Sequence, residues 1–209
     1  MHPLHEALVA ATHGRFPPVD GVVEVHPPGP DGQCASVEFT GHAHVLTHRD
    51  EADVLAQGVD AFGGADAPDF LRWLAGPDGL IGSHDMVLVA TGLGGGSLPL
   101  RDDLEEHPRV ERARRYRRDV RVHGDSAGFV CLGRGLVDRL EVSVELLPET
   151  MDGEGSGRRL IQEGLRLVPE GDLMWAQVAP GNAASVRAFL SAGFTPIGAE
   201  VLIEPRPAD

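Results

Sequence analysis

The spacing of apolar residues in the second half of the chain alternates between strand and helix periodicity. Period-two alternation and short apolar runs predict strands over Asp119–His123, Gly128–Gly133, Leu140–Leu147 and Leu173–Val178. Helical spacing predicts a helix over Arg101–Tyr116 with a break at Pro108, one after the glycines that follow residue 152, one after residue 182, and then a last strand. The expected order is helix, three strands, helix, strand, helix and strand.

The first half of the chain is less regular. Its pattern predicts helices over residues 2–13 and Ala67–Leu74. Short strands are expected at Val22–Val25, Ala35–Phe39, His44–Thr47 and Met86–Ala90. The glycine-rich run Gly92–Ser97 is typical of a linker. We therefore expect an unassigned N-terminal lobe over residues 1–92 and a second domain over residues 93–209.

The strand at Leu140–Leu147 leads through Gly153-Glu154-Gly155-Ser156-Gly157 into a helix. Such a turn presents free backbone N–H groups, and the helix dipole adds positive potential, so it suits a phosphate. Glycines let the backbone approach phosphate oxygens that a Cβ would exclude. Arg158, in the first helical turn, could add a charge-assisted contact.

Two common phosphate-binding motifs fit this turn poorly. A Walker loop needs Lys followed by Ser or Thr after its last glycine, whereas Arg158 follows Gly157 here. A dinucleotide fingerprint needs its third glycine one position later. It also needs an acid at the end of the next strand, and Asp172 precedes that strand.

A second motif follows the strand Leu173–Val178. Asn182 is placed to cap a short helix, and Gly193 suits the left-handed position that ends it. Together, the loop Asp152–Gly157 and the segment Asn182–Phe194 resemble the acetyl-CoA-binding core of the GNAT acetyltransferase superfamily. The resemblance covers about the C-terminal half. It implies an α/β (α+β) fold with a mixed, mostly antiparallel sheet flanked by helices, beside the additional N-terminal lobe.

The resemblance also implies an activity, the transfer of an acetyl group from acetyl-CoA directly to the primary amine of a small molecule or peptide. The residues that it places at the cofactor are Leu146, Leu147, Gly153, Gly155, Ser156, Gly157, Arg158, Asn182, Ser185 and Phe189. Backbone N–H groups near Leu146 and Leu147 would polarise the thioester carbonyl. Asn182 could contact the cofactor, cap its helix, or do both.

Two positions depart from the family pattern. Asp152 stands where the loop usually has Gln or Arg, and Phe189 replaces the tyrosine that often protonates the departing thiolate. The one tyrosine of the chain is Tyr116. These departures favour an alternative, a catalytically silent CoA-binding sensor or interaction module.

A base must take the proton of the attacking amine, whose pKa is about 10 when free. Glu141, Ser143 and Glu145 share one face of their strand. A carboxylate on this strand resembles the family's usual base, so Glu141 and Glu145 are the catalytic candidates. The alternative is that both are solvated charges. His123 is a lesser candidate.

Composition and charge restrict the possible partners, location and nucleophiles of the protein. The net charge of −14 argues against general affinity for nucleic acid or anionic membranes. No basic N-terminal flank or apolar stretch of about 20 residues is visible, so we expect a cytoplasmic protein without a membrane span. Cys34 and Cys131 are expected to be reduced, structural thiols. The absence of lysine excludes a lysine nucleophile.

Two further groups of residues, three histidines and a cluster of arginines, have patterns with more than one interpretation. His42, His44 and His48 fall on one side of an extended segment, but no adjacent Cys or acidic ligand completes a set, so no metal site is expected. Seven of the 18 arginines lie within Arg109–Arg121. Pairing with nearby carboxylates is the favoured interpretation. The other interpretation is a nucleic-acid-directed acetyltransferase that uses this cluster. Two copies of the chain could also pair.

Overall fold

The computed structural model describes residues 2–147 and 155–206 and divides the chain into two compact units. The first unit comprises residues 1–87 and 197–209, and the second comprises residues 88–196. The second unit thus begins close to the expected boundary at residue 92. Residues 197–209 fall instead with the first unit, because the last strand pairs with a strand of that unit.

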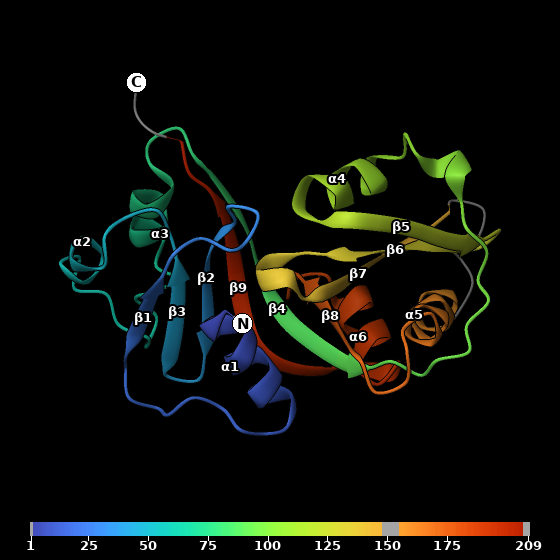
Figure 1. Cartoon of the computed structure of the whole chain (residues 1–209), viewed down its shortest axis with the longest axis horizontal. Helices are drawn as coiled ribbons and strands as arrows, with labels where there is room; N and C mark the ends of the chain where they lie inside the picture. Colours follow the sequence, from blue (N-terminus) through green and yellow to red (C-terminus); the bar gives the residue numbers. More distant parts are fainter. Residues whose placement is uncertain (1, 148–154, 207–209) are drawn as a thin grey trace. The chain divides into compact units, whose positions relative to one another are not determined.

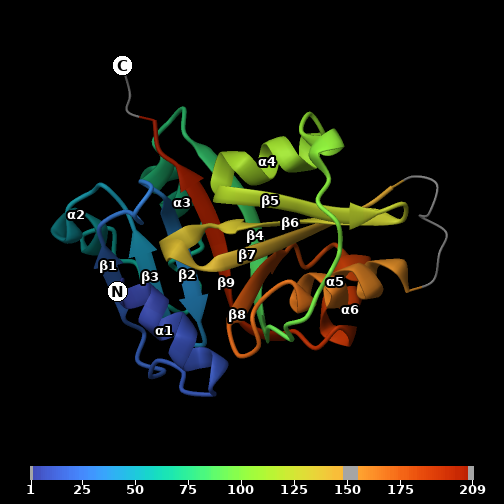
Figure 2. The same ribbon diagram turned by 45° about the vertical axis from the view of Figure 1, so that its right-hand side comes forward.

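The second unit carries the predicted alternation of helices and strands. Its elements are η1 (Asp102–Leu104), α4 (Pro108–Tyr116), β5 (Arg118–Asp125), β6 (Gly128–Arg134), η2 (Leu136–Asp138), β7 (Leu140–Leu146), α5 (Ser156–Arg166), β8 (Leu173–Val178) and α6 (Ala183–Ser191). The strands lie in the order β4-β8-β7-β6-β5, where β4 contributes its C-terminal end. Helix α4 lies on one face of β5 and β6, and α5 lies on the other face (Figures 1 and 2).

Burial explains this placement. On the α4 face, Val110 and Ala113 pack with Val122, Phe129 and Cys131 in one buried cluster. On the other face, α5 buries its apolar stripe, which consists of Leu160, Ile161 and Leu165. The expected break at Pro108 is present, since α4 begins there and His107 accepts the Arg109 N–H as its N-cap. The chain between η1 and α4 is therefore not one continuous helix.

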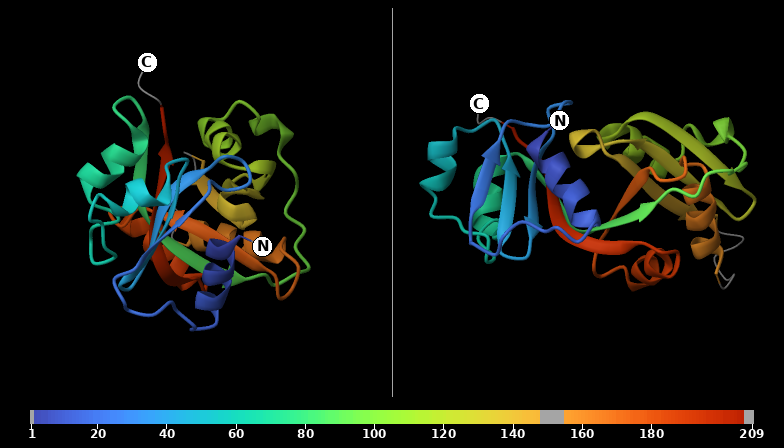
Figure 3. Two further views of the ribbon diagram at one scale, coloured as in Figure 1. Left: turned by 60° about the vertical axis from the view of Figure 1, so that its left-hand side comes forward. Right: turned by 60° about the horizontal axis from the view of Figure 1, so that its bottom comes forward.

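The first unit has its own core. Its elements are α1 (Pro3–Thr12), β1 (Val23–His26), β2 (Cys34–Phe39), β3 (His42–Leu46), α2 (Glu51–Leu55), α3 (Pro68–Ala75), most of β4 (Leu80–Thr91) and most of β9 (Thr195–Glu204). The strands lie in the order β1-β3-β2-β9-β4. Helices α1 and α3 lie on opposite faces of β1, β3 and β2 (Figures 1 and 3). Phe70, Leu71 and Leu74 of α3 pack against Val45 and Val201.

The fold class agrees with the prediction. Among the pairs with a described register, β2–β3, β2–β9, β5–β6 and β6–β7 are antiparallel, whereas β1–β3 and β7–β8 are parallel. The structure is thus a mixed α/β fold whose mostly antiparallel strands are flanked by helices. Helix α2 was not expected, and β4 is longer than the expected Met86–Ala90. Both cysteines are free and buried, as expected. None of the helices in the described part of the chain combines the length and the hydrophobicity that a membrane span needs.

Glu38 of β2 allows a stability prediction. Burial, followed by the charge of Asp66 and a hydrogen bond with it, raises the pKa of Glu38 from 4.5 to about 7. The folded state therefore binds this proton more tightly than the unfolded state. Its stabilising contribution is present below pH 4.5 and is lost as the pH rises through 7, a change of about 3 kcal/mol.

Glu38→Gln is therefore expected to unfold at higher denaturant concentration than the wild type at pH 8, with little difference at pH 4.5. Urea denaturation at the two pH values measures this. The exposed Glu170→Gln is the control and should show no such dependence. An equal advantage for Glu38→Gln at both pH values would contradict the assignment.

Candidate active site

Strand β7 pairs to different extents with its two neighbouring strands, β6 and β8. It pairs with β6 along its whole length, from Leu140 opposite Arg134 to Leu146 opposite Gly128. With β8, the register within the described residues is a single position, Glu141 opposite Trp175. Beyond Glu141, the edge of β7 that faces β8 therefore has no paired position with β8 among the described residues.

The backbone donors at this end can be assigned. The N–H of Leu147 donates to the carbonyl of Ala127, at 3.0 Å, on the β6 side. Because N–H groups alternate between the two edges of a strand, the N–H of Leu146 points to the β8 side. The Leu146 N–H thus faces the edge toward β8, whereas the Leu147 N–H is used within the sheet. A contact of either group with a thioester stays a prediction.

The N-terminus of α5 follows β7 along the chain. Gly155, the N-cap residue, has φ of 87°, a left-handed conformation that favours glycine, and as a glycine it offers no capping side chain. A Cβ built on Gly155 meets no atom within 4 Å, and one built on Gly157 meets only Ala188, at 3.8 Å. Among the described residues, the backbone of the first turn is therefore open to close approach at Gly155 and Gly157. Gly153 lies outside the described residues.

Two adjacent arginines at the start of α5, Arg158 and Arg159, differ in their ion pairing. Arg159 pairs with Asp125 at 2.8 Å, and this hydrogen bond, chiefly, lowers the pKa of Asp125. Arg158 is exposed and makes no ion pair with any residue that the structure describes. Arg158 is thus available to an incoming anion.

Helix α6 begins beside this region. The side chain of Asn182 accepts the Ser185 N–H at 3.1 Å and so caps the helix, and both residues lie toward the surface. Phe189 is 5% exposed and packs edge-to-face on Phe194, with ring centroids 5.0 Å apart. Phe189 thus serves the core. A cofactor contact for any of these three stays a prediction.

The two catalytic candidates occupy very different environments. Glu141 is 4% exposed and accepts from Arg117 Nε and Arg139 Nε, each at 2.8 Å. Burial alone would raise the pKa of this carboxyl, but the two guanidinium groups outweigh burial and lower it. A carboxylate held in this way is a poor proton acceptor, so its geometry is that of a structural ion triad.

Glu145 is the better base candidate. Its side chain is one-third exposed, and its Oε2 lies 2.8 Å from Arg109 Nε. It stands close to the end of β7, one residue before the Leu146 N–H. The side chain can therefore reach water and an incoming substrate, which Glu141 cannot.

A polar network between β7 and β8 was missed by the sequence analysis. Arg117 donates to Glu141, to Ser143 Oγ at 3.2 Å, and to Gln177 Oε1 of β8 at 3.1 Å. Arg117 thus connects the two strands. The signal was Gln177 itself, a polar residue inside the apolar run of β8.

The remaining ionisable candidates are engaged elsewhere. His123 Nδ1 contacts the Leu98 carbonyl at 2.8 Å. In the arginine cluster, ion pairs with carboxylates include those of Arg109 with Glu145, Arg114 with Glu105, Arg117 with Glu141 and Arg118 with Asp138. Arg112 and Arg115 lie over the ring of Tyr116. This pairing favours the internal role of the cluster over nucleic-acid binding.

Comparison with known proteins gives a likeness of fold. No family model and no curated protein matches the chain. Among solved structures, a GNAT-family protein from Novosphingobium aromaticivorans is 18% identical, with a TM-score of 0.43, over 63% of this chain and 69% of that one. A GCN5-related N-acetyltransferase from Kribbella flavida is 14% identical, with a TM-score of 0.41, over 67% of this chain and 63% of that one.

A GNAT-family acetyltransferase from Colwellia psychrerythraea is 11% identical, with a TM-score of 0.36, over 61% of this chain and 57% of that one. With TM-scores below 0.5 and identities below 20%, these likenesses carry no argument about family, activity or ligand. Activity, cofactor and substrate therefore depend on the residues described above.

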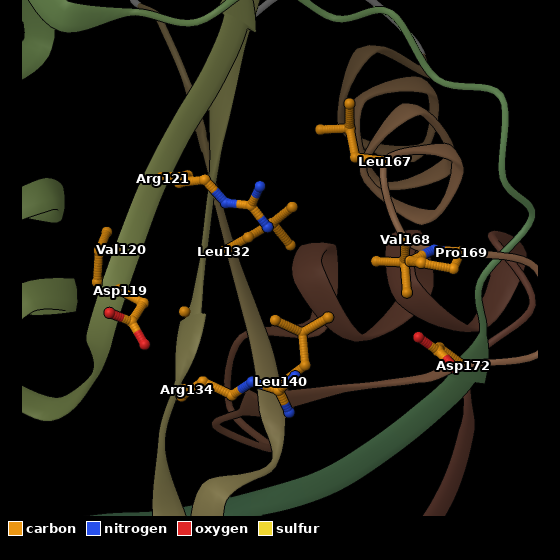
Figure 4. A pocket seen from close by; sticks show the side chains of 11 residues that line it. Asp119, Val120, Arg121, Leu132, Arg134, Leu140, Leu167, Val168, Pro169 and Asp172 are labelled. Atoms are coloured by element: carbon orange, nitrogen blue, oxygen red, sulfur yellow. The ribbon is translucent and has the colours of Figure 1, made fainter.

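A separate pocket lies elsewhere in this unit. It measures about 530 Å³ and opens between β5, β6 and the chain that follows α5 (Figure 4). Two acids, Asp119 and Asp172, and two arginines, Arg121 and Arg134, line it together with apolar side chains. None of the predicted cofactor residues that the structure describes lines this pocket. Its balanced charge also differs from that of a phosphate site.

Proposed function

We propose that the second unit binds acetyl-CoA and transfers its acetyl group to the primary amine of a small molecule or peptide. The observation that carries this proposal is the start of α5, where the left-handed Gly155 precedes the helix and Arg158 is exposed in its first turn. Such a helix start suits the diphosphate of CoA. The carboxyl end of β7 precedes this helix in the chain, and its edge toward β8 suits the thioester.

Each step of the transfer has a candidate group. Acetyl-CoA would supply the thioester, and the Leu146 N–H would stabilise the negative charge that develops on its carbonyl oxygen. Glu145 would take the proton of the amine, directly or through water, because the free amine has a pKa of about 10. The new C–N bond replaces the C–S bond, and the thiolate leaves.

The missing tyrosine does not prevent this reaction. A thiol has a pKa of about 8.5, so its thiolate is a moderate leaving group at neutral pH and can be protonated by solvent. Phe189 is buried and cannot supply a proton. The proposed mechanism therefore contains no protein acid at this position.

Arg158→Ala tests the phosphate contact. One charge-assisted hydrogen bond is removed, so the affinity for CoA should fall about 10-fold in calorimetry. The matched control is Arg166→Ala, at the other end of the same helix, which should bind like the wild type. Equal affinities for Arg158→Ala and the wild type would contradict the proposed contact.

One observation favours the silent CoA-binding module as a second candidate. The ion pair between Arg109 and Glu145 occupies the proposed base. Thiol release from acetyl-CoA, measured across a panel of amines, separates the two. Release that depends on the amine supports the enzyme, whereas CoA binding without release by any amine supports the module.

A further inference from the structure

The first unit holds a group of imidazoles that the proposed function does not use. Glu24 and His26 alternate along β1, and His42 and His44 alternate along β3. The two strands are parallel, and Glu24 is opposite His44 in the register. These four side chains therefore share one face, away from the apolar cluster that contains Val23, Val25, Ala43 and Val45.

Their donor atoms converge on the Glu24 carboxylate. Its Oε1 lies 3.3 Å from His42 Nε2, and its Oε2 lies 3.6 Å from His44 Nδ1 and 3.4 Å from His26 Nε2. His26 Nε2 and His44 Nδ1 are 2.9 Å apart. Atoms of Glu24, His42 and His44 all lie within 4.8 Å of one another.

These separations match those of a coordination shell. Ligand atoms at about 2.0–2.1 Å from a tetrahedral zinc ion are about 3.3–3.4 Å from each other. The separations between the Glu24 oxygens and the histidine nitrogens, 3.3 to 3.6 Å, are close to or above this value, and the 2.9 Å between His26 Nε2 and His44 Nδ1 is below it. One carboxylate with two or three neutral imidazoles is also a donor set that suits zinc and its neighbours in the first transition row.

We propose that Glu24, His42 and His44 bind a divalent transition-metal ion, of which Zn²⁺ is the reference, with His26 as the fourth ligand. The site lies in the first unit and is independent of the proposed acetyl transfer. It would join β1 to β3 on the face that carries α1.

The surroundings support the ligand roles. The other nitrogen of His42, Nδ1, lies 2.9 Å from Asp20 Oδ1, which is the carboxylate–histidine arrangement that orients metal ligands. His42 and His44 are each 3% exposed, so their rings are fixed by packing. The side chain of Glu24 is 44% exposed and gives an ion access from solvent.

Neighbouring histidines are excluded as ligands. Both nitrogens of His2 are engaged, since Nδ1 accepts the Leu4 N–H and Nε2 contacts the Pro27 carbonyl. His48, which the sequence grouped with His42 and His44, is exposed beyond the end of β3. No acidic ligand lies next to these histidines in the sequence. The pairing of β1 with β3 brings Glu24 to them.

The test is a titration of the full chain, first treated with a chelator, with Zn²⁺ alone. We expect one ion per chain by calorimetry, and visible absorption bands typical of a tetrahedral site when Co²⁺ replaces zinc. Glu24→Gln should weaken binding about 100-fold or more, and Asp20→Asn about 10- to 100-fold. Mg²⁺ should not compete, because it prefers oxygen ligands.

The matched control is His84→Ala. His84 belongs to a second group of potential ligands, with Glu38 and Asp66, and is exposed. Circular dichroism verifies that each variant is folded. Loss of zinc in the folded Glu24→Gln and its retention in His84→Ala support the proposal. Absence of zinc binding in the wild type, full binding by Glu24→Gln, or loss only in His84→Ala would overturn it.

Discussion

Glu145→Gln is expected to lower kcat for acetyl transfer by about 100-fold or more while leaving CoA affinity unchanged. The substitution keeps the size of the side chain and removes its ability to take a proton, a role that contributes about 10²- to 10⁴-fold. Steady-state thiol release with a reactive amine gives kcat, and calorimetry gives the affinity for CoA. A remaining rate that increases with pH would agree with solvent taking over as base.

A carboxylate outside the site serves as the control for this variant. Glu163 of α5 is also partly exposed, and its nearest cation is Arg166, at 3.9 Å. Glu163→Gln should retain the wild-type kcat. Full activity in Glu145→Gln would remove this residue from the mechanism, and a loss confined to CoA affinity would make it a binding residue only.

Glu141→Gln is expected to destabilise the second unit by about 3–5 kcal/mol. Arg139 is fully buried and Arg117 nearly so, and the substitution would remove the negative charge that both guanidinium groups contact. Because the folded state lowers the pKa of Glu141, the carboxylate stabilises the fold above pH 4.5, its ordinary value. This contribution is lost as the pH falls through the lowered value, so variant and wild type should converge in acid.

Urea denaturation followed by circular dichroism measures this effect. The control is Glu105→Gln, which removes a surface ion pair with Arg114 and should cost less than about 1 kcal/mol. A small effect of Glu141→Gln at pH 7 would show that the triad is not a structural element.

The sequence predicted the second unit well because its signals are local. Proline at the start of α4, the apolar stripe of α5 and the cap at Asn182 each act within a few residues, and each appears at the expected position. The helix α2 has only five residues and too few apolar positions to be recognised.

The contacts that could not be predicted join residues far apart in the chain. Period-two alternation placed Glu141 and Glu145 on one face, but only the tertiary structure shows that Arg117 and Arg139 hold the first and leave the second accessible. The same reason applies to Glu24, which β-pairing brings to His42 and His44. The return of β9 to the first unit likewise depends on its pairing with β2.

The central claim is that the first turn of α5 holds the diphosphate of CoA. A crystal structure of the complex with CoA tests it most directly. We predict phosphate oxygens within hydrogen-bond distance of the backbone N–H groups of residues 156–158, with the sulfur at the β7 edge near Leu146. A complex with the diphosphate bound elsewhere, for example in the pocket lined by Arg121 and Arg134, would contradict the account.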